Sequence, residues 1–132
     1  DQGVMILGSG NIVHNLRLIQ WNKPDSAFDW AERFDDGAHE QLASNPDAVL
    51  RLVEHADYAL AVPTPDHFIP LLYIAGLAAA SGEPMEALIR GYAMGSLSMT
   101  CYGVGVDVSL NEEQAEGAAT LPAGVPADQT NI

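Results

Sequence analysis

The sequence has 132 residues, 48% of them hydrophobic, which suffices for one packed domain. Its 18 acidic and five basic residues give a formal net charge of −13, which argues against binding nucleic acid or docking on an anionic membrane. The single cysteine, Cys101, excludes an internal disulfide and suits a reducing cytoplasm, and the longest apolar run, residues 68–80, is too short to span a bilayer.

The first expected element is a short buried strand. Residues 4–7 form an apolar run that ends in the turn Gly8-Ser9-Gly10. Asn11 is then expected to cap a helix over residues 12–19. Because the sequence opens at Asp1 and enters a core-like strand almost at once, we expect it to be part of a longer product.

Three further helices are expected between residues 26 and 82. The first starts at Ser26, where a Ser-x-x-Asp signal precedes an apolar stripe. The second starts at Asn45-Pro46, with a cap followed by proline in the first turn. The third covers residues 64–80 and is stopped by Gly82. The residues expected on the buried sides of the first two are Phe28, Ala31, Phe34, Ala38, Leu42, Val49, Leu52, Val53 and Ala56.

The spacing changes to alternation after residue 84. Residues 85–93 and 97–106 are expected to be antiparallel strands joined by a hairpin turn, with Cys101 as a buried thiol. The expected fold class is therefore α/β, a central mixed sheet with flanking helices and a C-terminal antiparallel strand pair. Residues 1–110 would form part of a larger domain, and residues 111–132, rich in Glu, Ala, Gly and Pro, a tail without its own core.

The glycine turn at residues 8–10 also resembles the opening of a dinucleotide-binding unit. The third glycine is absent, since position 13 is Val13, and no acidic residue ends a second strand about 20 positions later. A tight turn, in which glycine permits positive φ or close approach, is therefore the favoured interpretation.

Four histidines are the candidate chemical groups. His39 falls on the polar side of the first long helix and is expected to be solvated, and His55 lies near a helix C-terminus, where a cation is favoured. His14 and His67 are each expected at the third helical position after a cap, where the positive helix end favours the neutral imidazole of a metal ligand or general base. Satisfied core histidines are the alternative, and the two interpretations of the pair are about evenly supported.

Three segments resemble a known family. They are residues 8–17 (GSGNIVHNLR), 64–73 (TPDHFIPLLY) and 94–99 (MGSLSM). In this order they are similar to the C-terminal half of the class III extradiol ring-cleavage dioxygenases, and most similar to the DOPA-dioxygenase-like branch. These oxidoreductases open a catechol-type ring beside its two hydroxyls by inserting both atoms of dioxygen. The resemblance thus implies a catechol-type small-molecule substrate and dioxygen.

The resemblance also implies a non-haem metal site, with Fe(II) expected for activity and Zn(II) possible as the bound ion. His67 matches a metal ligand of the family. His14 matches the acid/base histidine beside the metal, which in substrate-free members can be close enough to be a fourth ligand. Such a metal holds the catecholate and leaves room for dioxygen, so it uses few protein ligands, and a nearby imidazole can exchange protons. Asn15 could orient a substrate hydroxyl, although packing is the favoured role.

The sequence departs from the family in one respect. The first two metal histidines of the family have no counterpart, because His39 and His55 lie in unrelated motifs. We therefore expect the chain alone to be inactive and the rest of the site to come from a missing N-terminal half or another chain. Part of an extradiol dioxygenase and a non-catalytic binding or assembly domain that retains the fold both remain open. Apolar strand edges would favour association, with a homo-oligomer as the commonest form.

Overall fold

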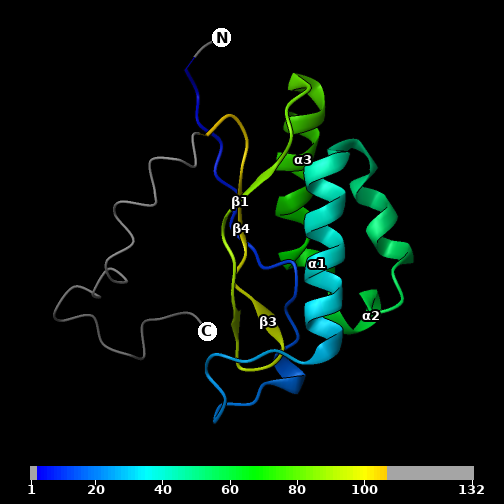
Figure 1. The fold of residues 1–132 in the computed structure, drawn as a ribbon, viewed down its shortest axis with the longest axis vertical. Helices are drawn as coiled ribbons and strands as arrows, with labels where there is room; N and C mark the ends of the chain where they lie inside the picture. The colour runs from blue at the N-terminus through cyan, green and yellow to red at the C-terminus, as the bar shows by residue number, and fades with distance from the viewer. Residues whose placement is uncertain (1–2, 107–132) are drawn as a thin grey trace, which may run out of the picture.

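Helices form one layer of the molecule and short strands the other (Figure 1). Residues 3–106 are described by the structure, a computed structural model. In chain order the elements are η1 (Leu16–Leu18), α1 (Asp29–Ser44), η2 (Pro46–Glu54), α2 (Tyr58–Ala61), η3 (Pro65–His67), α3 (Ile69–Ser81), β1 (Glu86–Ile89), β2 (Tyr92–Ala93), β3 (Leu97–Ser98) and β4 (Cys101–Gly103), where η marks a 3₁₀ helix. This arrangement confirms the expected α/β class. The expected tail, residues 111–132, lies outside the described residues.

Helix α1 supplies the centre of the core. Its expected stripe is fully buried at Ala31, Phe34, Ala38 and Leu42. The helix begins at Asp29 and not at Ser26, because the preceding segment is held by the hairpin turn. There Gly95 donates its backbone N–H to the Ser26 carbonyl at 2.8 Å and accepts from Phe28 N–H at 2.8 Å.

The second expected helix begins where expected, whereas the third, expected over residues 64–80, is divided into η3 and α3 and ends close to the expected position. Element η2 starts after Asn45 with Pro46 in its first turn, but it is a 3₁₀ helix. With three residues per turn, Val49 and Leu52 share the buried edge, whereas Val53 turns outward. Ala56 lies beyond the end of η2, and both Val53 and Ala56 are exposed, contrary to expectation. Helix α3 ends where Gly82 adopts a left-handed φ of 72°. Among residues 3–106, no helix is long and apolar enough to cross a bilayer.

The expected antiparallel hairpin is present in two pieces. β1 pairs with β4, and β2 pairs with β3, both antiparallel. Met94 and Gly95 form the turn with φ of 54° and 81°. Cys101 is exposed and not buried, because it lies opposite Ile89 on the open face of the β1–β4 pair.

The N-terminal segment differs most from expectation. Residues 4–7 belong to no strand and are exposed, because no strand among the described residues pairs with them. The helix expected over residues 12–19 is reduced to η1. Residues before it run along β3 instead: His14 forms an antiparallel bridge with Leu97, and a parallel bridge joins Ala27 to Gly95. Pairing with β3 thus replaces the expected first helical turn.

Candidate metal centre

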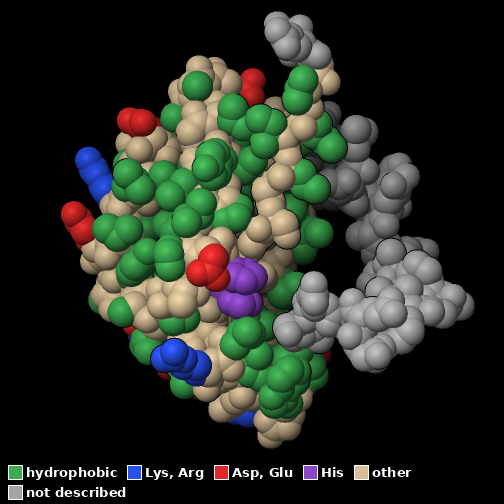
Figure 2. Space-filling view, turned by 180° about the vertical axis from the view of Figure 1, so that it is seen from behind, with side chains coloured by type: hydrophobic (Ala, Val, Ile, Leu, Met, Phe, Trp, Pro, Cys, Tyr) green, Lys and Arg blue, Asp and Glu red, His purple; other side chains and the backbone are tan. Residues whose placement is uncertain are grey.

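His14 and His67 lie against each other. Their ring centroids are 3.6 Å apart and the ring planes differ by 10°, so the two imidazoles are stacked. The structure therefore brings together the two histidines that the sequence predicts as site residues. Figure 2 shows histidine side chains at the surface, bordered by hydrophobic side chains and one acidic group.

His14 is positioned by backbone pairing and not by a helix. Its N–H donates to the Ala61 carbonyl at 2.9 Å, at the end of α2. The neighbours Val13 and Asn15 are buried, and His14 between them is half-buried. The Asn15 amide donates to the Leu60 carbonyl at 2.9 Å and accepts from Arg17 N–H at 3.2 Å. Asn15 therefore anchors the segment, which favours its structural role over contact with substrate.

His67 occupies the third position after Thr64, as expected, at the end of η3. The Thr64 hydroxyl donates to the Asp66 carboxylate at 3.2 Å and does not cap the backbone. Gly10 packs against this turn so closely that an added Cβ would overlap the His67 carbonyl oxygen. The glycine at position 10 thus serves close approach between two chain segments, as the tight-turn interpretation predicted.

The electrostatics favour a neutral His14. Burial lowers the pKa of His14 below its ordinary value, the neighbouring His67 lowers the pKa further, and Asp66 acts in the opposite direction. A neutral imidazole keeps the lone pair that binding a metal or accepting a proton requires. Nδ1 of His67 is buried and has no hydrogen-bond partner among the described residues. Both observations fit nitrogen donors of a metal site.

His14 and His67 alone do not make a metal centre, because two ligands are too few and their rings are not oriented toward one ion. The nitrogen lone pairs of two stacked imidazoles lie in nearly parallel planes, so one ring must turn before nitrogens of both can converge on one ion. Residues 3–106 hold no group of three or more His, Cys, Asp or Glu side chains arranged to bind a metal. The donor chemistry thus fits two positions of a site whose remaining ligands lie elsewhere.

The other two histidines have separate environments. His39 is not solvated as expected: it is half-buried with its ring 6.3 Å from that of Tyr102, because β4 covers this side of α1. His55 caps the C-terminus of η2, and its Nδ1 accepts from Asp57 N–H at 3.1 Å. Its ring also meets Phe34 edge to face at 5.2 Å.

A buried carboxylate that the sequence analysis missed supports the strand carrying His14. Asp35 is fully buried on α1 and accepts hydrogen bonds from Arg90, Tyr92, Ser98 and Thr100 at distances between 2.5 and 3.3 Å. Burial, and then the charge of Asp35, raises the pKa of Tyr92 to about 12. The sequence signal that could have revealed Asp35 is its spacing, three residues before Ala38 and four after Ala31 on the buried side of α1.

The Asp35 network reaches the histidine segment through Ser98. The Ser98 carbonyl accepts from the Asn11 amide at 2.7 Å, and the Ser98 N–H donates to the Val13 carbonyl at 3.0 Å. The carboxylate on α1 thus holds the strand edge along which residues 11–14 lie. His14 depends on this edge for its position beside His67.

Comparison with known proteins finds similarity to an extradiol dioxygenase. The chain is 38% identical over 109 residues to "4,5-DOPA dioxygenase extradiol" of Escherichia coli (strain K12), a match that covers 80% of this chain. The crystal structure of uncharacterized protein JW3007 from Escherichia coli K12 superposes with a TM-score of 0.62 at 37% identity and covers 71% of this chain. No family model matches.

The matches confirm the resemblance to the DOPA-dioxygenase-like extradiol family, and they are consistent with its C-terminal part. The chain spans 40% of the length of each of these two relatives.

Proposed function

We propose that the chain is the part of a non-haem metal-dependent extradiol dioxygenase that carries one metal ligand and the proton-transfer residue. His67 is the ligand and His14 transfers the proton. The observation that carries the proposal is the stacking of these two imidazoles, 3.6 Å apart, within two of the three motifs that resemble the family.

The proposed substrates are a catechol-type molecule and dioxygen. The bound ion, Fe(II) for activity or Zn(II) as an alternative occupant, would supply the centre at which both are held. His67 would contribute a ring nitrogen to that ion. Burial and His67 lower the pKa of His14, which favours its neutral form, in which a ring nitrogen can accept the proton of a catechol hydroxyl and return it later.

Further ligands must come from outside residues 3–106. Two imidazoles hold a metal weakly and with little selectivity. We propose that a preceding N-terminal portion of the same domain, or another chain, supplies the remaining ligands. In this proposal residues 1–110 form part of the catalytic domain, and the chain alone has negligible turnover.

Oxygen consumption tests this function. The chain is co-expressed with the portion of the Escherichia coli relative that it does not match, reconstituted anaerobically with Fe(II), and supplied with DOPA. We expect oxygen uptake by the assembly, none by the chain alone, and a loss of at least about tenfold in the assembly after His14→Ala or His67→Ala. His39→Ala, a histidine outside the pair, is the matched control.

Two outcomes would contradict the proposal. Rapid uptake by the 132-residue chain alone would show that it contains a complete site. Full uptake by both the His14→Ala and His67→Ala assemblies would favour the non-catalytic binding or assembly domain.

A further inference from the structure

Helix α3 has no charged side chain along its length. An apolar sequence all around a helix is typical of one buried on every side. In this structure Leu71, Ala75 and Ala78 are buried, but Tyr73 is 70% exposed and Leu77 is also exposed. One face of α3 is therefore apolar and uncovered.

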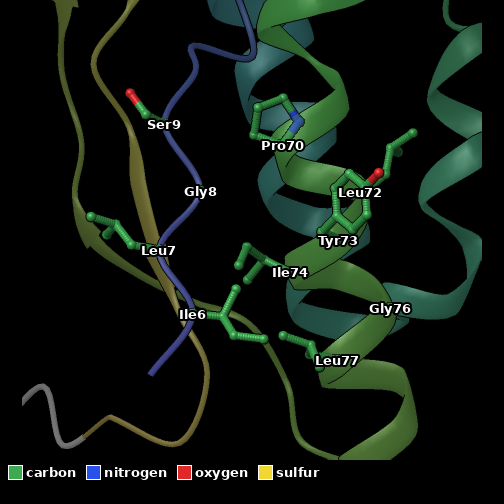
Figure 3. Close-up of a pocket in the computed structure, with 10 residues that line it drawn as sticks. All are labelled: Ile6, Leu7, Gly8, Ser9, Pro70, Leu72, Tyr73, Ile74, Gly76 and Leu77. Carbon is green, nitrogen blue, oxygen red and sulfur yellow. The ribbon is translucent and has the colours of Figure 1, made fainter. Parts of the chain in front are cut away.

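The N-terminal segment runs beside this face and completes a groove (Figure 3). The groove has a volume of about 560 Å³ and is lined by Ile6, Leu7, Pro70, Tyr73, Ile74 and Leu77 among others. Side chains at residues 4–7 are between 54% and 86% exposed. Within the described part of the chain, the backbone of residues 4–10 makes no hydrogen bond. This segment thus presents both an apolar surface and unpaired backbone groups, as an edge strand does.

The N-terminal segment that borders the groove packs against the start of α3, close to His67. An added Cβ at Gly8 would lie 3.3 Å from Pro70 Cβ, and Gly10 packs on the His67 carbonyl. The segment is therefore held against the start of α3, immediately beside His67.

We infer that this groove docks a polypeptide that adds a β-strand along residues 4–7 and covers α3 with an apolar face. The occupant is the remainder of an extradiol dioxygenase-like domain. Two observations favour it over a second copy: both relatives extend well beyond the 40% that the chain spans, and two chains of net charge −13 repel each other. The identity of this partner rests on the proposed function, whereas the docking surface itself does not.

Metal-free co-purification tests the inference. The chain is co-expressed with the tagged unmatched portion of the Escherichia coli relative and purified in EDTA without substrate. Tyr73→Glu and Leu77→Glu place a charge in the groove, and Ile89→Glu, at a 62% exposed position on β1, is the matched control. We expect the wild type and Ile89→Glu to co-purify and the groove variants to be recovered at least about tenfold less, which corresponds to about 1.4 kcal/mol. Circular dichroism checks that each variant is folded.

Amide hydrogen exchange provides the second measurement. We expect residues 4–7 to exchange freely in the chain alone and to become protected in the complex, because strand addition pairs their backbone groups. Absence of co-purification, an equal loss in Ile89→Glu, or exchange at residues 4–7 that the complex does not slow would overturn the inference. So would a dimer of the chain alone that the groove variants dissociate, since a second copy would then be the occupant. A complex that forms without metal but takes up no oxygen after reconstitution with Fe(II) and addition of DOPA would overturn the proposed function and leave this inference standing.

Discussion

Replacing Asp35 tests whether the buried carboxylate holds the strands against α1. In Asp35→Ala the hydroxyls of Ser98 and Thr100, 3.0 Å apart, can still bond to each other, so one buried hydroxyl loses its acceptor. The Tyr92 hydroxyl also loses Asp35, but Tyr92 is only partly buried and water can replace that acceptor. An unsatisfied buried group costs about 1–3 kcal/mol. Arg90 is partly exposed and still pairs with Asp36, so loss of its ion pair with Asp35 adds about 0–1 kcal/mol. The expected loss in the free energy of unfolding is therefore about 1–4 kcal/mol.

Urea unfolding followed by fluorescence of the two tryptophans measures this loss. Asp36→Ala is the matched control, because Asp36 is exposed and binds Arg90 alone, and we expect it to cost about 0–1 kcal/mol. Asp35→Asn keeps the shape and one acceptor, so it should fall between the two and remains measurable if Asp35→Ala does not fold. If Asp35→Ala were as stable as Asp36→Ala, the carboxylate would not be holding the strands.

Two further predictions concern stability. Arg33 lowers the pKa of Asp57 through a side-chain hydrogen bond, so the stabilisation is present above the ordinary pKa of Asp57 and is lost as pH falls through the lowered one. Arg33→Gln should therefore be destabilised at neutral pH and converge with the wild type in acid, and urea midpoints that differ equally at every pH would refute this. Gly10→Ala, which meets the His67 carbonyl, should lower stability by about 1–3 kcal/mol. Gly76→Ala should raise stability by up to about 1 kcal/mol, because an added Cβ at Gly76 in α3 meets open space. Thermal melts in which Gly10→Ala and Gly76→Ala shift stability in the same direction would contradict the close packing at Gly10.

Local signals predicted the elements that depend on local interactions. The stripe of α1, the left-handed Gly82 after α3 and the hairpin follow from spacing and turn chemistry. Residues 4–19 were predicted wrongly because their structure depends on distant pairing: β3 takes up the backbone around His14, and no described strand pairs with residues 4–7. The spacing of residue types along a chain does not show with which distant strand a segment pairs.

The two candidate histidines lie together, but only one of them lies where the helix argument placed it. His67 does occupy its expected helical position, but His14 lies on a strand edge, so the argument from helix position fails for one member of the pair. The two histidines were selected together because of the three motifs that resemble the family, and not because of helical periodicity. Asp35 was passed over because its charge suggested a solvated position, although its spacing places it on the buried stripe.

Metal content of the co-expressed assembly tests the central claim most directly. Inductively coupled plasma mass spectrometry after dialysis would compare the wild type with His67→Ala, His14→Ala and the control His39→Ala. We expect the wild-type and His39→Ala assemblies to retain stoichiometric metal, His67→Ala to lose most of it, and His14→Ala to retain most of it. Undiminished metal in the His67→Ala assembly would contradict the assignment of His67 as a ligand.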